Sequence, residues 1–242
     1  MIAVEERDSI AILTLDRGGA RNAIPVSGWD ALADRVAAIA QSDVSAVLLR
    51  SAMPGVFSAG ADLTEFPSLI AEPVARARFR TAMHRAIEGL AGLPMPVVAA
   101  VDGGCFGAAV ALTLACDIVV AGGEAVFATT PAKLGIGYPA SDVARLRARV
   151  GAGQAATMLF TGGRIDATEA ARIGLAHHLA PHAEGAAHDL TRAIAANAPE
   201  AVRLLKRILR HPDDADHDRA FDAMFGEEAF AARLNAFLSG AR

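Results

Sequence analysis

The stretch PVVAAVDGGCFGAAVALTLACDIVVA, from Pro96 to Ala121, decides the fold class of this chain. Its two ends, Pro96–Val101 and Asp117–Ala121, are rich in small and branched apolar residues, which is typical of strands buried on both faces. Between them, Ala108–Cys116 carries no charged side chain, so we expect a helix that is buried all round. Because this helix has so little side-chain chemistry, any functional role must come from its backbone.

Similar segments lie before this stretch. Ile10–Leu15 and Ala46–Ser51 predict two further buried strands. Ser27–Gln41 and Pro73–Gly92 have apolar residues at helical spacing, with Ser27 as the expected N-cap of the first helix. Strands that alternate with helices in this way predict an α/β fold.

The last part of the chain has no strand-like segment. His188–Arg210 and Asp218–Leu238 predict helices, and the polar segment His211–Asp218 predicts a loop between them. We therefore expect a mixed α/β core over residues 1–183, which holds the site, and a helical region over residues 184–242.

Composition and charge narrow the possible classes of protein. The chain has 242 residues, 53% hydrophobic and 21% charged, with a formal net charge of −4. These values fit one globular domain and give no reason to expect nucleic acid or an anionic membrane as a partner. No apolar run reaches the ~18–20 residues that cross a bilayer, and the acidic start Met1–Ile10 is unlike a signal peptide. Cys105 and Cys116 lack metal-type spacing, which favours buried free thiols in a reducing cytoplasm.

Several common kinds of site lack their sequence motifs here. His177, His178, His182 and His188 cluster, but Pro181 interrupts any helix that would align them, so we do not predict a metal site. There is no G-x-S-x-G elbow and no G-x-x-x-x-G-K-[ST] phosphate loop. The segment DGGCFG begins with aspartate where the dinucleotide fingerprint G-x-G-x-x-G needs glycine.

Two strand-to-helix junctions can expose backbone N–H groups. Gly60 lies in a turn of small residues after the strand Ala46–Ser51, and a glycine-rich segment follows the strand Pro96–Val101. A helix N-terminus carries unpaired donors and about half a positive charge, so two such ends aimed at one point would form an oxyanion hole. Ordinary turns between strand and helix are the alternative, and these residues alone leave both open.

Four segments are similar, in order and spacing, to the motifs of the crotonase family, also called the enoyl-CoA hydratase/isomerase family. They are LDRGGARNAI (Leu15–Ile24), FSAGADLTEF (Phe57–Phe66), the stretch Pro96–Ala121 and LFTGGRIDATEAARIGLAHHL (Leu159–Leu179). The resemblance spans nearly the whole chain and implies a crotonase-type ββα superhelix with a helical C-terminal trimerisation region. It also implies homotrimers or hexamers and an acyl-CoA thioester as ligand, with coenzyme A as part of the substrate and no separate cofactor.

The resemblance further implies an oxyanion hole made of two backbone N–H groups, those of Ala61 and Ala108. The family usually has glycine at the position of Ala108, so the added methyl group would narrow the space beside the thioester. Arg21 lies beside the segment that lines the coenzyme A entrance, where it either contacts phosphate or is a solvated surface arginine. The coenzyme A portion would contact the backbone of Ala59, Gly60, Ala61, Asp62 and Leu63.

The two glutamates that hydratases of this family use have no counterpart in this chain. The first position, three residues after Ala108, is Ala111. The second is Pro131 when counted from Phe127, or Ala132 when the segment is aligned on its proline. Addition of water to a double bond needs a base and an acid, and none of these side chains supplies either. We therefore expect poor hydratase activity.

Tyr138 is the side chain best suited to chemistry. Some decarboxylase-like members of the family are similar in having a tyrosine a few residues after Leu-Gly, where the phenol would orient a carboxylate or donate a proton. A core tyrosine with a satisfied hydroxyl is the alternative. Glu65 and Asp142 are weaker candidates because surface carboxylates are usually only solvated. Asp62 is expected to fix a turn or a helix start.

Two functions remain open. The first is an acyl-CoA lyase or isomerase that stabilises a thioester enolate, although hydratase is the name that the resemblance alone suggests. The second is a non-catalytic acyl-CoA binding protein that keeps the pocket without the chemistry. Both need the oxyanion backbone, so only a side-chain base or proton donor distinguishes them. Tyr138 and the intact FSAGAD segment favour the enzyme.

Overall fold

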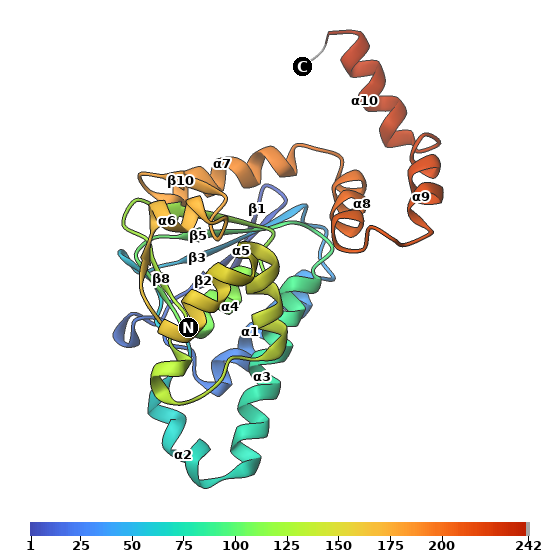
Figure 1. The fold of residues 1–242 in the computed structure, drawn as a ribbon. Coiled ribbons are helices and arrows are strands. Elements are labelled where there is room, and N and C mark those ends of the chain that lie inside the picture. Colours follow the sequence, from blue (N-terminus) through green and yellow to red (C-terminus); the bar gives the residue numbers. More distant parts are fainter. Residues whose placement is uncertain (241–242) are drawn as a thin grey trace.

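The computed structural model describes residues 1–240, which form two β-sheets surrounded by helices (Figure 1). The larger sheet contains, in spatial order, β1 (Ile2–Arg7), β2 (Ile10–Leu15), β3 (Ala46–Ser51), β5 (Val97–Val101), β7 (Ile118–Gly122) and β10 (His178–Ala180). The smaller sheet contains β4 (Val56–Ser58), β6 (Gly104–Phe106), β8 (Val126–Ala128) and β9 (Ile165–Asp166).

The chain winds between the two sheets in repeats of two strands and a helical segment. β3, β5 and β7 are parallel neighbours in the larger sheet, and β4, β6 and β8 are parallel neighbours in the smaller one. The helices that follow the three strand pairs are α2 (Phe66–Ala71) with α3 (Pro73–Gly92), then α4 (Ala108–Leu114), then α5 (Ala140–Thr161). This winding confirms the expected ββα superhelix.

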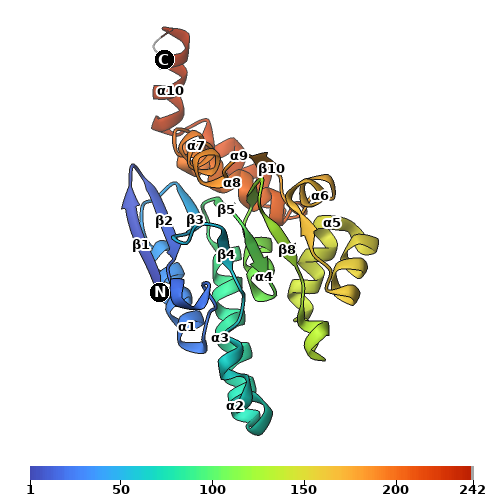
Figure 2. The ribbon, with the colours of Figure 1, turned by 90° about the vertical axis from the view of Figure 1, so that its left-hand side faces the viewer.

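Helices cover both faces of the larger sheet, as Figure 2 shows. α1 (Val26–Ile39) and α3 pack on one face, where Trp29 and Leu90 are fully buried. α7 (Ala183–Ala195) packs on the other face, with Ala187 against Leu48 and Val98 of the sheet. Because both faces are covered, apolar residues run along the strands without alternation. Cys105 and Cys116 are buried free thiols within this core, as expected.

The remaining helices lie in the C-terminal part of the chain. α6 (Ala167–Arg172) precedes β10, and α8 (Pro199–Arg210), α9 (His217–Met224) and α10 (Glu228–Leu238) follow α7. In Figure 1, α10 projects from the rest of the chain. α9, α10 and the residues between them form an arm in which three phenylalanines stack edge to face. The ring centres of Phe221 and Phe225 are 5.2 Å apart, and those of Phe225 and Phe230 are 5.3 Å apart. Within residues 1–240, no helix combines the length and apolarity needed to cross a membrane.

The expected strands and the helix Pro73–Gly92 are confirmed, but the expected N-cap of α1 is wrong. α1 begins at Val26, so Ser27 already lies inside the helix. The N–H of Val26 donates instead to the Glu65 carboxylate at 2.7 Å. A carboxylate from a distant segment thus satisfies one of the free donors of the helix start.

Both helices expected near the C-terminus are interrupted. The segment His188–Arg210 forms parts of two helices, because Pro199 begins α8 after an extended residue at Ala198. The segment Asp218–Leu238 is interrupted around Gly226, between α9 and α10.

Candidate active site

The two glycine-containing junctions converge in the folded chain. β4 and β6, which precede them, pair in parallel. Gly60 has a φ of +89°, and a β-carbon built on it would lie 2.4 Å from the carbonyl oxygen of Phe106 and 3.0 Å from the nitrogen of Ala108. Only glycine lets the two turns approach this closely in this conformation.

The N–H of Ala61 points away from Ile24, the residue with which Ala61 forms a β-bridge. The N–H of Ile24 donates to the Gly60 carbonyl at 2.7 Å, and the N–H of Asp62 donates to the Ile24 carbonyl at 3.0 Å. This is a parallel bridge in which the flanking peptide groups face Ile24. The Ala61 N–H therefore points to the opposite side, and Ala61 lines a cavity there.

The Ala108 N–H belongs to a peptide group whose carbonyl oxygen accepts two hydrogen bonds. Gly107 has a φ of +54° and directly precedes α4. Its carbonyl oxygen accepts from the Val110 N–H at 3.0 Å and from the Tyr138 hydroxyl at 2.9 Å. Because this carbonyl and the Ala108 N–H form one peptide group, both bonds fix the direction of that N–H. A hydrogen bond to the carbonyl also polarises the peptide and strengthens its donor.

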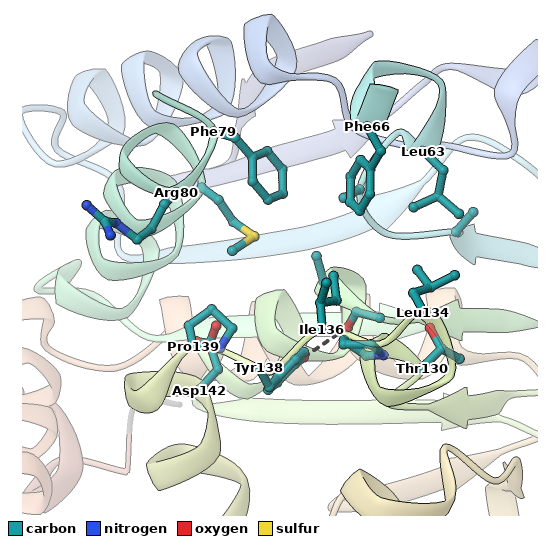
Figure 3. A pocket seen from close by; sticks show the side chains of 17 residues that line it. Leu63, Phe66, Phe79, Arg80, Thr130, Leu134, Ile136, Tyr138, Pro139 and Asp142 are labelled. Atoms are coloured by element: carbon teal, nitrogen blue, oxygen red, sulfur yellow. Dashed lines mark hydrogen bonds between the residues drawn. The ribbon is translucent and has the colours of Figure 1, made fainter. Parts of the chain in front are cut away.

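A cavity of about 330 Å³ lies against these two turns. Figure 3 shows one wall with Leu63, Phe66 and Phe79 and an opposite wall with Leu134 and Ile136. The rings of Phe66 and Phe79 meet edge to face, with their centres 5.7 Å apart. The whole lining consists of Ala59, Ala61, Leu63, Phe66, Phe79, Arg80, Met83, Gly107, Ala108, Thr130, Pro131, Leu134, Ile136, Gly137, Tyr138, Pro139 and Asp142.

Three of these lining residues have ionisable side chains, namely Arg80, Tyr138 and Asp142. Burial raises the pKa of the Tyr138 phenol well above its usual range, and the nearby Asp142 adds to the effect. The phenol therefore stays protonated and donates to Gly107. Burial also raises the pKa of Asp142 to about 6, against the lowering effect of Arg145. Asp142 is thus the group in this cavity that changes protonation near neutral pH.

The structure places the candidate residues in two groups. Ala59, Ala61, Leu63, Ala108 and Tyr138 line the cavity together.

Gly60, Asp62 and Arg21 lie outside the lining. Gly60 permits the close approach of the two turns. The Asp62 carboxylate accepts from the Thr64 N–H at 3.0 Å and pairs with Arg17 at 2.6 Å, so it fixes the turn, as expected for an aspartate at a helix start. Arg21 contributes its carbonyl oxygen to the Ala59 N–H at 3.0 Å, and its side chain is exposed.

The positions at which the resemblance implies glutamates differ in their relation to the cavity. Ala111 is 1% exposed, belongs to the buried core and is not among the lining residues. Pro131 belongs to the lining, whereas Ala132 is exposed and does not line the cavity. The cavity wall therefore holds no glutamate in either register, and its one carboxylate is Asp142.

The burial of Asp142 and the apolar walls of the cavity were not predicted from the sequence. Asp142 was expected on the surface, but it is only 2% exposed. Its place in the first turn of α5 carries no local signal of burial, since the covering residues come from α3. Phe66 follows the FSAGAD motif by four residues, so its apolar character could have marked it as part of a wall, whereas Phe79 lies further along the chain in α3. Among residues 1–240, no three His, Cys, Asp or Glu side chains are grouped to hold a metal ion.

Known proteins resemble the chain over nearly its full length. The family model described as enoyl-CoA hydratase/isomerase matches residues 5–232. The short-chain-enoyl-CoA hydratase of Clostridium acetobutylicum is 32% identical over 235 residues, 95% of this chain and 87% of that protein. The mitochondrial methylglutaconyl-CoA hydratase of Mus musculus is 32% identical over 219 residues, 88% of this chain and 69% of that protein. The crystal structure of enoyl-CoA hydratase from Bacillus anthracis has a TM-score of 0.92 at 27% identity and covers 99% of this chain and 96% of that one.

Proposed function

Because the chain belongs to the enoyl-CoA hydratase/isomerase family, we propose that it is an acyl-CoA lyase or isomerase that stabilises a thioester enolate. The family membership makes an acyl-CoA enzyme the general class. The finer assignment rests on one observation, which is that two free backbone donors lie on adjoining turns beside an apolar cavity without a glutamate.

The N–H groups of Ala61 and Ala108 would bind the thioester oxygen. Neither donates a hydrogen bond to any part of the described chain. Negative charge develops on this oxygen when a proton leaves the neighbouring carbon, so donors fixed beforehand stabilise the enolate more than the ground state. The bond from Tyr138 to the Gly107 carbonyl holds the Ala108 donor in place.

The apolar walls suit a short or medium acyl group. Leu63, Phe66, Phe79 and Met83 offer hydrocarbon surface, and about 330 Å³ is enough for such a group but not for the whole thioester. We assign the contacts to coenzyme A to the backbone of Ala59–Leu63 and to the exposed Arg21 at the entrance.

Isomerisation or a related proton transfer fits this cavity better than hydration does. Hydration needs one group that activates water and another that protonates the α-carbon. The cavity contains one carboxylate, and the phenol of Tyr138 is already donating to a carbonyl. A decarboxylase-like reaction that uses Tyr138 remains the second candidate, since such a reaction would also form an enolate in the same oxyanion hole.

The test compares two substrates with the purified protein. Conversion of 3-hexenoyl-CoA to 2-hexenoyl-CoA appears as a gain of enoyl-thioester absorbance, and hydration of crotonyl-CoA appears as a loss. We expect the first reaction and only slow hydration. Tight binding of both thioesters without any turnover would instead indicate a non-catalytic acyl-CoA binding protein.

We also propose a trimeric or hexameric assembly. The arm formed by α9, α10 and the residues between them exposes Phe221, Phe225 and Phe237, of which Phe237 is 83% exposed. Exposed aromatic side chains on a projecting arm are typical of surfaces that another subunit covers.

A further inference from the structure

The proposed enolate chemistry requires a base, and the cavity offers few groups for this role. Arg80 cannot act as one, because a guanidinium is not deprotonated in proteins. The Tyr138 hydroxyl donates its proton to the Gly107 carbonyl at 2.9 Å and is held in its protonated form. Asp142 is the remaining ionisable side chain of the lining.

We propose that Asp142 is the catalytic acid–base residue, whose carboxylate removes a proton from the carbon next to the thioester and returns it to the substrate. This inference rests on the proposed function and names the group that performs its proton transfer.

The position of Asp142 between two cavities supports this role. Asp142 lines the acyl cavity and also a second cavity of about 420 Å³, whose lining includes Arg80, His84 and Ser141. Asp142 thus borders the proposed substrate space and a second cavity at the same time. In this proposal, the second cavity is the route by which Asp142 exchanges its proton with solvent while the substrate fills the first.

The neighbouring charges leave Asp142 only partly neutralised. Arg145 lies 3.3 Å from Asp142 but 2.5 Å from Glu88, so it is shared between two carboxylates. His84 in turn lies 3.6 Å from Glu88. The charged or titratable groups that face Asp142 are Arg145 on α5, Arg80, His84 and Glu88 on α3, and Tyr138 in the preceding loop. α4 contributes none, and Lys133, on the other neighbouring segment, packs against Gly162 at the far end of α5.

This environment gives Asp142 a proton affinity suited to the task. Burial raises its pKa to about 6. A general base works best when its pKa lies near the working pH, since it is then ionised yet still basic enough to take a proton. An exposed aspartate, with a pKa of about 3.9, would be a much weaker base.

The proposed step is balanced by the substrate and Asp142 alone. The Asp142 carboxylate forms an O–H bond with the α-hydrogen, and the C–H electron pair becomes the carbon–carbon double bond of the enolate. The electrons of the thioester C=O bond move to the oxygen, which Ala61 and Ala108 hold. In a 3-enoyl thioester, the protonated Asp142 then delivers its proton to the γ-carbon, which completes the isomerisation. One carboxylate thus serves as base and acid in turn.

The test measures exchange of α-hydrogen for deuterium in butyryl-CoA dissolved in D₂O, followed by NMR. Butyryl-CoA has no double bond, so exchange reports enolate formation alone. The variant is Asp142→Asn, which keeps the shape of the side chain and removes its titration. The control is Glu88→Gln, because Glu88 shares Arg145 with Asp142 but lines neither cavity. Calorimetry with butyryl-CoA gives the affinity of each protein, and Asp142→Ala replaces Asp142→Asn if the latter does not fold.

We expect Asp142→Asn to bind butyryl-CoA as the unaltered protein does and to exchange at least about 100-fold more slowly. Exchange by the unaltered protein should rise with pH through a midpoint near 6, and Asp142→Asn should lose this midpoint. Glu88→Gln should exchange at a rate close to that of the unaltered protein at pH 8.

Three results would overturn the proposal in distinguishable ways. Undiminished exchange by Asp142→Asn excludes Asp142 as the base and leaves the enolate function intact. Binding without exchange by the unaltered protein excludes both the base and the enolate chemistry, which favours a binding protein. A failure of the unaltered protein to bind butyryl-CoA removes the proposed function itself.

Discussion

The hydroxyl of Tyr138 donates to the carbonyl oxygen of Gly107 across 2.9 Å, and this carbonyl is the other half of the peptide group that presents the Ala108 N–H. Tyr138 thus contacts the proposed oxyanion hole through the Gly107 carbonyl and not through the donating Ala108 N–H. In the proposed reaction, Tyr138 would therefore act through this hydrogen bond and would keep its own proton.

Replacement of Tyr138 by phenylalanine should slow the isomerase reaction only modestly. The substitution removes one hydrogen bond, which contributes about 0.5–1.5 kcal/mol, and therefore lowers kcat between about two- and tenfold. The ring still packs in the cavity wall, so affinity for butyryl-CoA should change little. Steady-state kinetics and calorimetry provide the two measurements. A loss of about 100-fold or more would show that the phenol transfers a proton itself, as the decarboxylase-like alternative requires.

A methyl group at Gly60 should abolish thioester binding. In Gly60→Ala the new carbon would lie 2.4 Å from the Phe106 carbonyl oxygen, so the two donor turns must separate. Gly55→Ala is the matched control, because Gly55 also has a positive φ of +69° but a β-carbon there meets nothing within 4 Å. Calorimetry with butyryl-CoA should show a loss for the first variant and retained affinity for the second. Equal affinity in both folded variants would disprove the site.

Hydration of crotonyl-CoA should be slow and should not be restored by a single glutamate. A placed acid–base side chain contributes roughly 10²–10⁴ in rate, and the wall of this cavity lacks the glutamate pair. In Ala111→Glu, the carboxylate would enter the buried core, where Ala111 is 1% exposed. Burial raises the pKa of such a carboxyl group and destabilises the fold. Loss of enoyl absorbance measures the rate, and turnover typical of ordinary hydratases would contradict the prediction.

Asp142→Asn should stabilise the protein at neutral and alkaline pH. The pKa of Asp142 is raised from 3.8 to about 6 in the folded chain, so ionisation above this range costs folding free energy. The contribution of Asp142 is fully present below pH 4 and is lost as the pH rises through 6. Asparagine avoids that cost, which is at most about 3 kcal/mol for a shift of this size.

Urea denaturation of both proteins at pH 8 and at pH 4 tests the stability prediction. The free energy of unfolding should be higher for Asp142→Asn at pH 8, and the difference should disappear at pH 4. A variant that is less stable at both values would show that the pairing with Arg145 outweighs the cost of burial.

The protein should form trimers or hexamers through its C-terminal arm. Light scattering at micromolar concentration measures the mass of the assembly. Replacement of Phe225 and Phe237 by serine should lower that mass, because both aromatic side chains are exposed in the single chain. Serine at Ile70, which is also exposed but lies on α2, should leave the assembly unchanged. A monomeric mass for the unaltered protein would remove the arm's proposed role.

The sequence by itself determined the elements and the motifs. Three elements occur at the residues expected for them, namely the strands Ile10–Leu15 and Ala46–Ser51 and the helix Pro73–Gly92. Their patterns, a continuous apolar run for a buried strand and apolar residues at helical spacing for a helix, can be recognised within a short stretch of sequence. The expectation that Ala111 and Pro131 stand where the family has glutamates came from the resemblance of the motifs and stays a prediction. The N-cap of α1 could not be predicted in this way, since Glu65 reaches Val26 only after the chain has folded back.

Only the tertiary structure decided what these residues do together. Gly60 and Ala108 come within contact because β4 and β6 pair, and a pairing between distant strands leaves no local pattern. Asp142 has the sequence context of an exposed residue in the first turn of a helix, yet α3 covers it and changes its proton affinity. Burial of a polar group depends on which segments pack over it. This packing is decided by the whole fold and not by the residues next to that group in the sequence.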